Sequence, residues 1–190
     1  MRAFRLLLFC LIFSARICSA ADLHQETPPV PALLGLDFSM SCTAAENLLL
    51  SRRYLNTSMV FATPYVERVY SAPDKACGTL TLTTCSARGM LISITCRGGD
   101  GERILALARE KMSLKAVDKQ QAEQGKQYTK TFEGGVRMTL RASGKQGELV
   151  LYSPHAATQC LRLVDEEKKA LAEKQTAADK DWKNSIDADF

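Results

Sequence analysis

The feature that most constrains the fold is the alternation of threonines and aliphatic residues between Gly78 and Arg97. An apolar side chain at every second position is typical of β-strands, so two strands with a turn between them are predicted here. A three-residue loop, 87–89, pairs Ser86 with Met90 and separates the apolar side chains from the hydroxyls. Gly89 then stands where such a loop needs a left-handed residue. We expect an antiparallel hairpin whose apolar face holds Leu80, Leu82, Met90, Ile92, Ile94 and Cys96.

Before this hairpin the sequence predicts one helix and one strand. Thr43 and Glu46 have the spacing of a capping box and precede an apolar run, so we expect a helix over residues 43–54. Residues 59–70 are rich in Val, Tyr and Phe but are interrupted by Pro64, which indicates an edge strand or a bent one. Together with the hairpin, these elements make an αβββ unit over residues 40–97.

A second αβββ unit is predicted over residues 98–155. Asp100 can cap a helix that runs to Met112, and a strand is expected at 126–132. A further hairpin pairs residues 136–140 with 149–152. The two units share an architecture but hardly any residues, so duplication and a chance succession of elements both stay open.

The last segment, from about residue 158, is charged and alanine-rich, which predicts one long helix. The expected order is therefore α-βββ-α-βββ-α, an α+β fold of helix–antiparallel-sheet units with a long C-terminal helix. We expect a globular domain over residues 37–164, and a charged C-terminal helix and tail over 165–190.

Residues 1–20 have the composition of a secretory signal peptide. Arg2 and Arg5 supply a positive start, residues 6–15 are apolar, and Ala20 is a small residue at the expected cleavage site. We therefore expect export, to the bacterial periplasm or as a secreted protein, and a eukaryotic secretory route fits the signal nearly as well. The proline-containing residues 21–36 indicate an extended leader before the domain.

Charge and hydropathy argue against two classes of partner. Removing residues 1–20 takes away three arginines and no acid, so the formal net charge falls from +4 to +1 (+4 − 3). Binding to nucleic acid needs a surplus of positive charge that such a chain lacks. No apolar run reaches the roughly 18 residues of a membrane span. We expect no nucleic-acid partner and no membrane span.

Five cysteines follow the signal peptide, and cysteines of exported proteins usually pair into disulfides. In the hairpin register above, Cys77 and Cys85 are eight residues apart on one strand, and Cys96 is several residues from both. Because a disulfide needs Cα atoms within about 7 Å, we expect no bond among these three. Cys42 and Cys160 then each bond to the hairpin region, and Cys85, on the outer face, is the expected free thiol. The candidates for the two disulfides are Cys42, Cys77, Cys96 and Cys160.

The sequence contains no recognisable catalytic, metal-binding or cofactor motif. C-x-x-C, H-E-x-x-H, G-x-S-x-G, a phosphate-binding loop and a dinucleotide fingerprint are all missing. Of the two histidines, His155 precedes Cys160 by five residues, which on a helix turns them about 140° apart. A thiol–imidazole pair is therefore not predicted. We expect no catalytic site, no metal and no cofactor.

The C-terminal helix carries the pattern that most suggests a partner. Apolar and polar residues follow one another at spacings of three and four, like a coiled-coil seam: Leu161, Val164, Lys168, Leu171, Gln175, Ala178 and Trp182. Lys168 and Gln175 make this seam too polar for a stable coiled coil. Two interpretations stay open. The helix is either a polar projection held by its own ion pairs, or Leu171, Ala178 and Trp182 dock into the groove of a protein partner.

These observations favour a non-enzymatic, exported, disulfide-braced binding protein, such as an inhibitor, an assembly factor or an envelope partner. The alternative is an exported hydrolase whose Ser, Asp and Glu residues are scattered along the sequence. The two hypotheses differ in whether turnover depends on a single Ser or Asp side chain.

Overall fold

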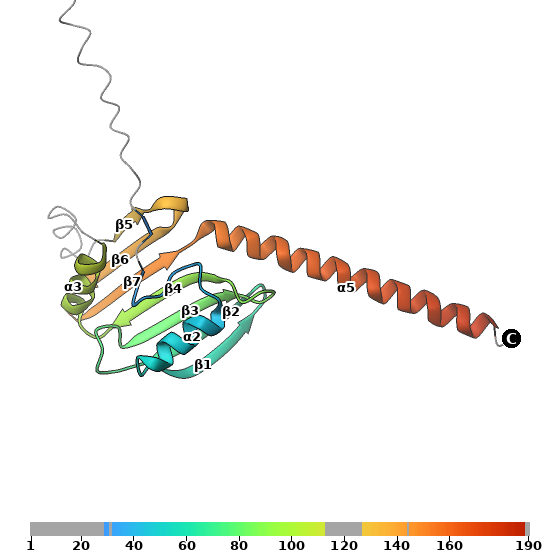
Figure 1. The fold of residues 1–190 in the computed structure, drawn as a ribbon, viewed down its shortest axis with the longest axis horizontal. Helices are drawn as coiled ribbons and strands as arrows, with labels where there is room; N and C mark the ends of the chain where they lie inside the picture. Colours follow the sequence, from blue (N-terminus) through green and yellow to red (C-terminus); the bar gives the residue numbers. More distant parts are fainter. Residues whose placement is uncertain (1–28, 31, 113–126, 144, 189–190) are drawn as a thin grey trace, which may run out of the picture.

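The computed structural model describes residues 29–30, 32–112, 127–143 and 145–188, and Figure 1 shows their arrangement. The predicted signal peptide, 1–20, and the start of the predicted leader lie outside the described residues. The elements, in chain order, are α2 (Cys42–Ser51), β1 (Leu55–Ala62), β2 (Tyr65–Ser71), β3 (Thr79–Cys85), β4 (Leu91–Gly98), α3 (Gly101–Met112), β5 (Tyr128–Thr131), the 3-10 turn η1 (Glu133–Gly135), β6 (Arg137–Ser143), β7 (Gln146–Tyr152) and α5 (Pro154–Ala188). The predicted α+β class with a long C-terminal helix is confirmed.

The strands form one antiparallel sheet in the order β1-β2-β3-β4-β7-β6-β5. β2-β3-β4 and β5-β6-β7 are each simple meanders, and they meet through their last strands, β4 and β7. At this junction Thr95 lies opposite Val150. The two predicted units therefore share a single sheet. Whether they arose by duplication or by a chance succession of elements stays open.

The first unit contains one strand more than predicted. Residues 59–70 do not form a single bent strand but belong to β1 and β2, whose hairpin turns at Thr63 and Pro64. Proline has no N–H to donate to a sheet, and its fixed φ suits a turn, so Pro64 ends one strand instead of bending it. The order of elements is thus α-ββββ-α-βββ-α.

The N-cap of helix α2 lies two residues before the predicted capping residue, Thr43. Ser41 is its N-cap, and its Oγ accepts a hydrogen bond from the backbone N–H of Ala44 at 3.2 Å. The predicted box of Thr43 and Glu46 is wrong, because the Glu46 carboxylate instead forms an ion pair with Arg68 of β2.

The predicted β3–β4 register is confirmed over most of the hairpin, where Leu80 lies opposite Cys96 and Leu82 opposite Ile94. Beyond Thr83 the register shifts at a β-bulge. Thr84 pairs with Leu91, so Ile92 is the extra residue, and the backbone N–H of Cys85 donates to Met90 O at 2.8 Å. A bulge reverses the alternation of side chains. Met90 and Ile92 therefore face away from Leu82 and Ile94, contrary to our expectation.

The main core lies between one face of the sheet and helices α2 and α3. Ala45 and Leu49 of α2 and Ile104 and Leu105 of α3 are fully or almost fully buried there against the aliphatic side chains of the central strands. Leu33 and Leu36 also belong to this core and are completely buried. The predicted leader, 21–36, therefore enters the domain before its expected boundary at residue 37.

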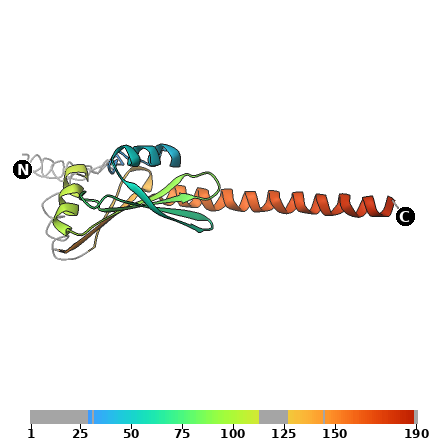
Figure 2. The same ribbon diagram turned by 90° about the horizontal axis from the view of Figure 1, so that it is seen from below.

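The opposite face of the sheet is covered at one end by the first turns of α5. A second buried cluster there holds Cys85, Ile92, Ala156, Ala157, Cys160 and Val164. Cys85 and Thr84 are neighbours on β3, so their side chains point to opposite faces, with Thr84 toward α2. Figure 2 shows α2 above the sheet and α5 leading away from it.

The two disulfides differ from the predicted set. Cys77 is bonded to Cys96, with their Cα atoms 5.3 Å apart, although we expected no bond within the hairpin region. The register of Cys96 was predicted correctly, but Cys77 does not continue β3 in a straight line. The chain folds back before it, with the N–H of Ala72 donating to Gly78 O at 2.9 Å. This turn brings Cys77 to β4.

The free thiol was also assigned to the wrong cysteine. Cys85 is bonded to Cys160, with a Cα–Cα distance of 5.4 Å, while Cys42 is the free cysteine within the described residues. Cys85 does lie on the predicted outer face. The sequence pattern did not reveal that α5 begins on that face and brings Cys160 against it.

Candidate functional site

The start of α5 is fixed by local hydrogen bonding. Ser153 is buried, and its Oγ accepts a hydrogen bond from the backbone N–H of Ala156 at 3.2 Å. Pro154 is the first residue of the helix, where a missing N–H removes no intrahelical bond. Cys160 and Val164, further along the helix and about one turn apart, are buried against the sheet. Packing and the disulfide to Cys85 thus anchor the base of α5.

Beyond Val164 the helix leaves the sheet and projects from the domain (Figures 1 and 2). Every side chain from Asp165 to Lys180 is exposed. At about 1.5 Å per residue, the part of α5 after Val164 extends for roughly 36 Å. Most of the stability of a helix in a protein comes from packing of an apolar face, and the side chains from Asp165 to Lys180 have no such packing within the described chain.

The predicted partner-binding residues all lie on this projection. Leu171 and Trp182 are each 66% exposed, and Ala178 is exposed between them. At about 100° per residue, these three positions fall within roughly 40° of one another around the helix. They therefore form one narrow line along α5, which we call the distal stripe.

The distal stripe continues the buried line at the base of the helix. Cys160 and Val164 fall within the same sector of roughly 40° as Leu171, Ala178 and Trp182. The side of α5 that packs on the sheet is therefore the side that carries the exposed apolar residues further out. Lys168 and Gln175 lie at the margin of this sector, so the stripe is narrower than the seam of a coiled coil.

A second cluster of polar side chains lies between α2 and the sheet. Glu46 accepts a hydrogen bond from Tyr70 Oη at 3.2 Å, and its carboxylate is 2.9 Å from Arg68 Nε. Arg68 Nη1 also donates to Thr84 Oγ1 at 2.8 Å. The Nε–H of Arg68 is not aligned with the carboxylate, so this contact is an ion pair without a geometric hydrogen bond. The cluster ties α2 to β2 and β3.

Cys42 lies at the edge of this cluster, and its Sγ donates to Glu46 Oε1 at 3.7 Å. Burial raises the pKa of the Cys42 thiol, the Glu46 carboxylate raises it further, and Arg68 opposes the shift. Burial and the charge of Glu46 likewise raise the pKa of the Tyr70 hydroxyl. Both groups are therefore neutral near pH 7, which suits a structural role better than nucleophilic chemistry. Sequence reasoning did not single out Arg68 or Tyr70, because nothing local indicates their contact with α2.

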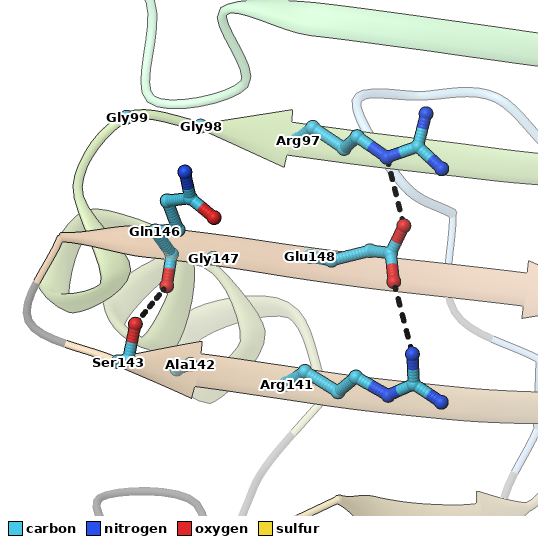
Figure 3. Close-up of a pocket in the computed structure, with 9 residues that line it drawn as sticks. All are labelled: Arg97, Gly98, Gly99, Arg141, Ala142, Ser143, Gln146, Gly147 and Glu148. Carbon is cyan, nitrogen blue, oxygen red and sulfur yellow. Dashed lines mark hydrogen bonds and ion pairs between the residues drawn. The ribbon is translucent and has the colours of Figure 1, made fainter. Parts of the chain in front are cut away.

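A shallow groove of about 530 Å³ lies on the sheet face away from α3, across β4, β7 and β6 (Figure 3). Glu148 lies between two arginines in this groove: its carboxylate accepts a hydrogen bond from Arg97 Nε at 2.8 Å and is 3.8 Å from Arg141 Nη1. Both arginine side chains are largely exposed. The shared carboxylate offsets much of their positive charge, so the arrangement is that of a cross-strand ion ladder that stabilises the sheet.

The histidine and cysteine that sequence analysis compared do not form a reactive pair. His155 is exposed in the first turn of α5, and the Cys160 sulfur is part of a disulfide. Within the described ranges, no group of three or more His, Cys, Asp or Glu side chains is placed to hold a metal ion. In the same residues, no helix has the length and apolar character needed to cross a membrane.

Comparison with protein-family models, with curated proteins and with solved structures finds no match for this chain.

Proposed function

We propose that this chain is an exported, disulfide-braced binding protein that holds a protein partner with the distal stripe of α5. The observation behind this proposal is the continuity of one apolar line, buried at Cys160 and Val164 and exposed at Leu171 and Trp182. An apolar line on a helix is typical of the side that packs against another element, and the exposed part of α5 has no such element within the described chain.

The spacing of the stripe suits a helix that lies in a groove. Leu171, Ala178 and Trp182 recur after seven and four residues, which is the pattern of anchors in helix-in-groove recognition. Tryptophan is also among the side chains most enriched in binding hot spots. Because the base of α5 is bonded and packed, the helix is presented in one direction, which lowers the entropic cost of binding.

The two disulfides are consistent with export. Disulfides persist in the periplasm and outside the cell but are rare in the reducing cytosol. Together with the predicted signal peptide, Cys77–Cys96 and Cys85–Cys160 favour a protein of the periplasm or the secretory route. The partner is then expected in the same compartment.

A pair of double variants tests the stripe directly. In the first, Leu171→Ala is combined with Trp182→Ala. In the control, Glu173→Ala is combined with Lys180→Ala, which leaves net charge unchanged and alters the opposite side of the same exposed helix. Both are used to capture partners from an extract of the native compartment. Loss of about 2 kcal/mol at one hot spot weakens binding roughly 30-fold, so the first variant should lose a partner that the control retains.

The fluorescence of Trp182, the sole tryptophan, gives a second readout. With a purified partner, its emission should shift to shorter wavelength as the exposed indole enters an apolar groove. A partner that binds both double variants equally, or that leaves the emission unchanged, would contradict the proposal. The hydrolase alternative gains support instead if a substrate panel reveals turnover that one Ser or Asp substitution abolishes.

A further inference from the structure

β1 is an edge strand with few of the features that usually protect such an edge. It is the first strand of the sheet, so its outer backbone groups pair with no other strand of the described chain. All eight residues are exposed, and none is charged. The largest apolar side chains are Leu55 at 66%, Met59 at 45%, Val60 at 52% and Phe61 at 75% exposure.

The opposite edge of the same sheet shows what protection looks like. β5 has only four residues, Tyr128–Thr131, and contains Lys130. Short length and lysine both discourage pairing with a further strand. The one protective feature of β1 is an irregularity between Asn56 and Ser58. Residues 58–62 pair regularly with β2, so their outer backbone groups are available to a further strand.

The register of β1 assigns its side chains to two faces. Val60 lies opposite Glu67, so it belongs to the face away from α2. Met59 and Phe61 lie opposite Arg68 and Val66 and belong to the α2 face. An added antiparallel strand must place each residue opposite one from the same face.

We propose that β1 pairs antiparallel with β1 of a second copy of this chain, with the twofold axis at Val60. In this register Val60 lies opposite its own copy, and Met59 lies opposite Phe61 of the second copy, twice by symmetry. Ser58 lies opposite Ala62. Moving the axis to Met59 would pair Phe61 with the irregular Thr57, and moving it to Phe61 would bring Pro64 opposite Ser58. Only the Val60 register places every large apolar side chain of residues 58–62 against another apolar one.

Charge also favours a second copy as the occupant. Residues 58–62 carry no charge, so self-pairing creates no like-charge pair across the new contact. The nearest charge opposite Val60 is Glu67, and the two copies of Glu67 would be about 14 Å apart, three strand spacings. This exceeds the Debye length of about 8 Å at physiological salt.

The small size of the contact limits its strength. A contact between two edge strands of this length is small beside the roughly 1,200–2,000 Å² of a stable interface. We therefore expect a reversible dimer that forms as concentration rises and joins two sheets through their edges. The distal stripe of α5 takes no part in it, so the dimer and the proposed partner binding can succeed or fail separately.

The first test introduces a lysine on one edge of the sheet or on the other and compares the effect on dimerisation. Dimerisation of the full mature chain is measured by sedimentation velocity. The chain carries Cys42→Ser, so that no dimer can form through a disulfide of the free thiol. We expect concentration-dependent dimerisation, weakened at least tenfold by Val60→Lys. The matched control is Thr129→Lys, an exposed position on the same face of β5, which should dimerise normally. A chain that stays monomeric at its highest soluble concentration overturns the proposal, as does a Val60→Lys variant that still dimerises.

The second test measures the register. In the Cys42→Ser background, Val60→Cys should form an intermolecular disulfide readily under mild oxidation, because the two copies face each other within disulfide range. Ser58→Cys is the control: its two copies would be offset by four residues, about 13 Å along the strand, and should not bond. Equal crosslinking at both positions overturns the Val60 register.

Discussion

At the scale of single residues, Cys42 shows how neighbours change the chemistry of a side chain. Its thiol is half-buried at the start of α2, within 3.7 Å of the Glu46 carboxylate. Burial and this carboxylate favour the neutral thiol, whereas the thiolate is the reactive form. Cys42 is thus free of a disulfide but protected from reaction at neutral pH.

This environment predicts slow, pH-dependent alkylation of Cys42. With its pKa raised above the ordinary value of 9.0, little thiolate is present at pH 8, and the rate should climb as pH rises beyond 9. Glu46→Gln should lower the pKa, because it removes the negative charge and leaves Arg68 nearby. Alkylation at pH 8 should then be faster, as followed by mass spectrometry with iodoacetamide.

Glu148→Gln, a change remote from the thiol, is the control and should leave the rate unaltered. Unreduced peptide maps should show the label on Cys42 alone among the cysteines of the described residues. Label on Cys85 would contradict its bond to Cys160, and an unchanged rate in Glu46→Gln would contradict the electrostatic explanation.

At the scale of elements, α3 sits on the sheet through positions that lack a Cβ. An added Cβ at Gly147 would lie 2.6 Å from Ile104 Cβ, which is too short for a side chain, and one at Gly98 would lie 3.1 Å from Ile104 Cδ1, a tight contact. The glycines on β4 and β7 therefore allow Ile104 to be completely buried.

Gly147→Ala should consequently destabilise the fold. Overpacking of this kind typically costs about 1–3 kcal/mol, and urea unfolding should show it as a lower midpoint. Gly99→Ala is the matched control, because a Cβ at Gly99 meets nothing within 4 Å. A Gly147→Ala variant as stable as the control would mean that α3 shifts without cost.

For the distal part of α5 we expect the opposite result, a change that leaves the stability of the fold unaltered. Since the described side chains from Asp165 to Lys180 are exposed, truncation after Lys169 should leave the thermal midpoint within about 2 °C of the full chain. The same truncation should abolish partner capture, because it removes Leu171 and Trp182. If it unfolds the domain, the distal helix contributes to the core; if the partner is retained, α5 is only a projection.

At the scale of the whole molecule, the disulfides connect parts that are far apart in the sequence. Cys77–Cys96 closes a separation of 19 residues within the sheet, whereas Cys85–Cys160 closes 75 residues and joins β3 to α5. The second bond therefore links the first unit to the helix that follows the second unit. It also holds the base of α5 on a face where the buried cluster is small.

Loss of the longer link should cost more stability than loss of the shorter one. From chain entropy alone, the double variant Cys85→Ala with Cys160→Ala should lose about 4 kcal/mol of the free energy of unfolding. The double variant Cys77→Ala with Cys96→Ala should lose about 3 kcal/mol. Unfolding in urea measures both double variants against the unaltered protein. A larger loss from the Cys77–Cys96 pair would show that packing around that bond outweighs the loop it closes.

Most of the local structure could be predicted from the amino-acid sequence. Alternation between Gly78 and Arg97 predicted the central hairpin and its register up to the bulge after Thr83. Asp100 predicted the start of α3, where its Oδ1 accepts from the N–H of Glu102 at 2.9 Å. Charged, alanine-rich residues after 158 predicted a long helix, and their spacing placed Leu171 and Trp182 on one line. These features depend on neighbours a few residues away, so they can be read from the sequence alone.

The contacts between distant segments could not be predicted in this way. The bond of Cys77 to Cys96 depends on a turn that folds the chain back after Ala72, and the bond of Cys85 depends on where α5 starts. The exposed edge at β1 likewise follows from its place in the sheet: the sequence indicated an edge strand or a bent one over residues 59–70, but not the β1–β2 hairpin that makes β1 the outermost strand. Such contacts depend on the path of the chain in space, because residues far apart in sequence meet only after every intervening turn has been made.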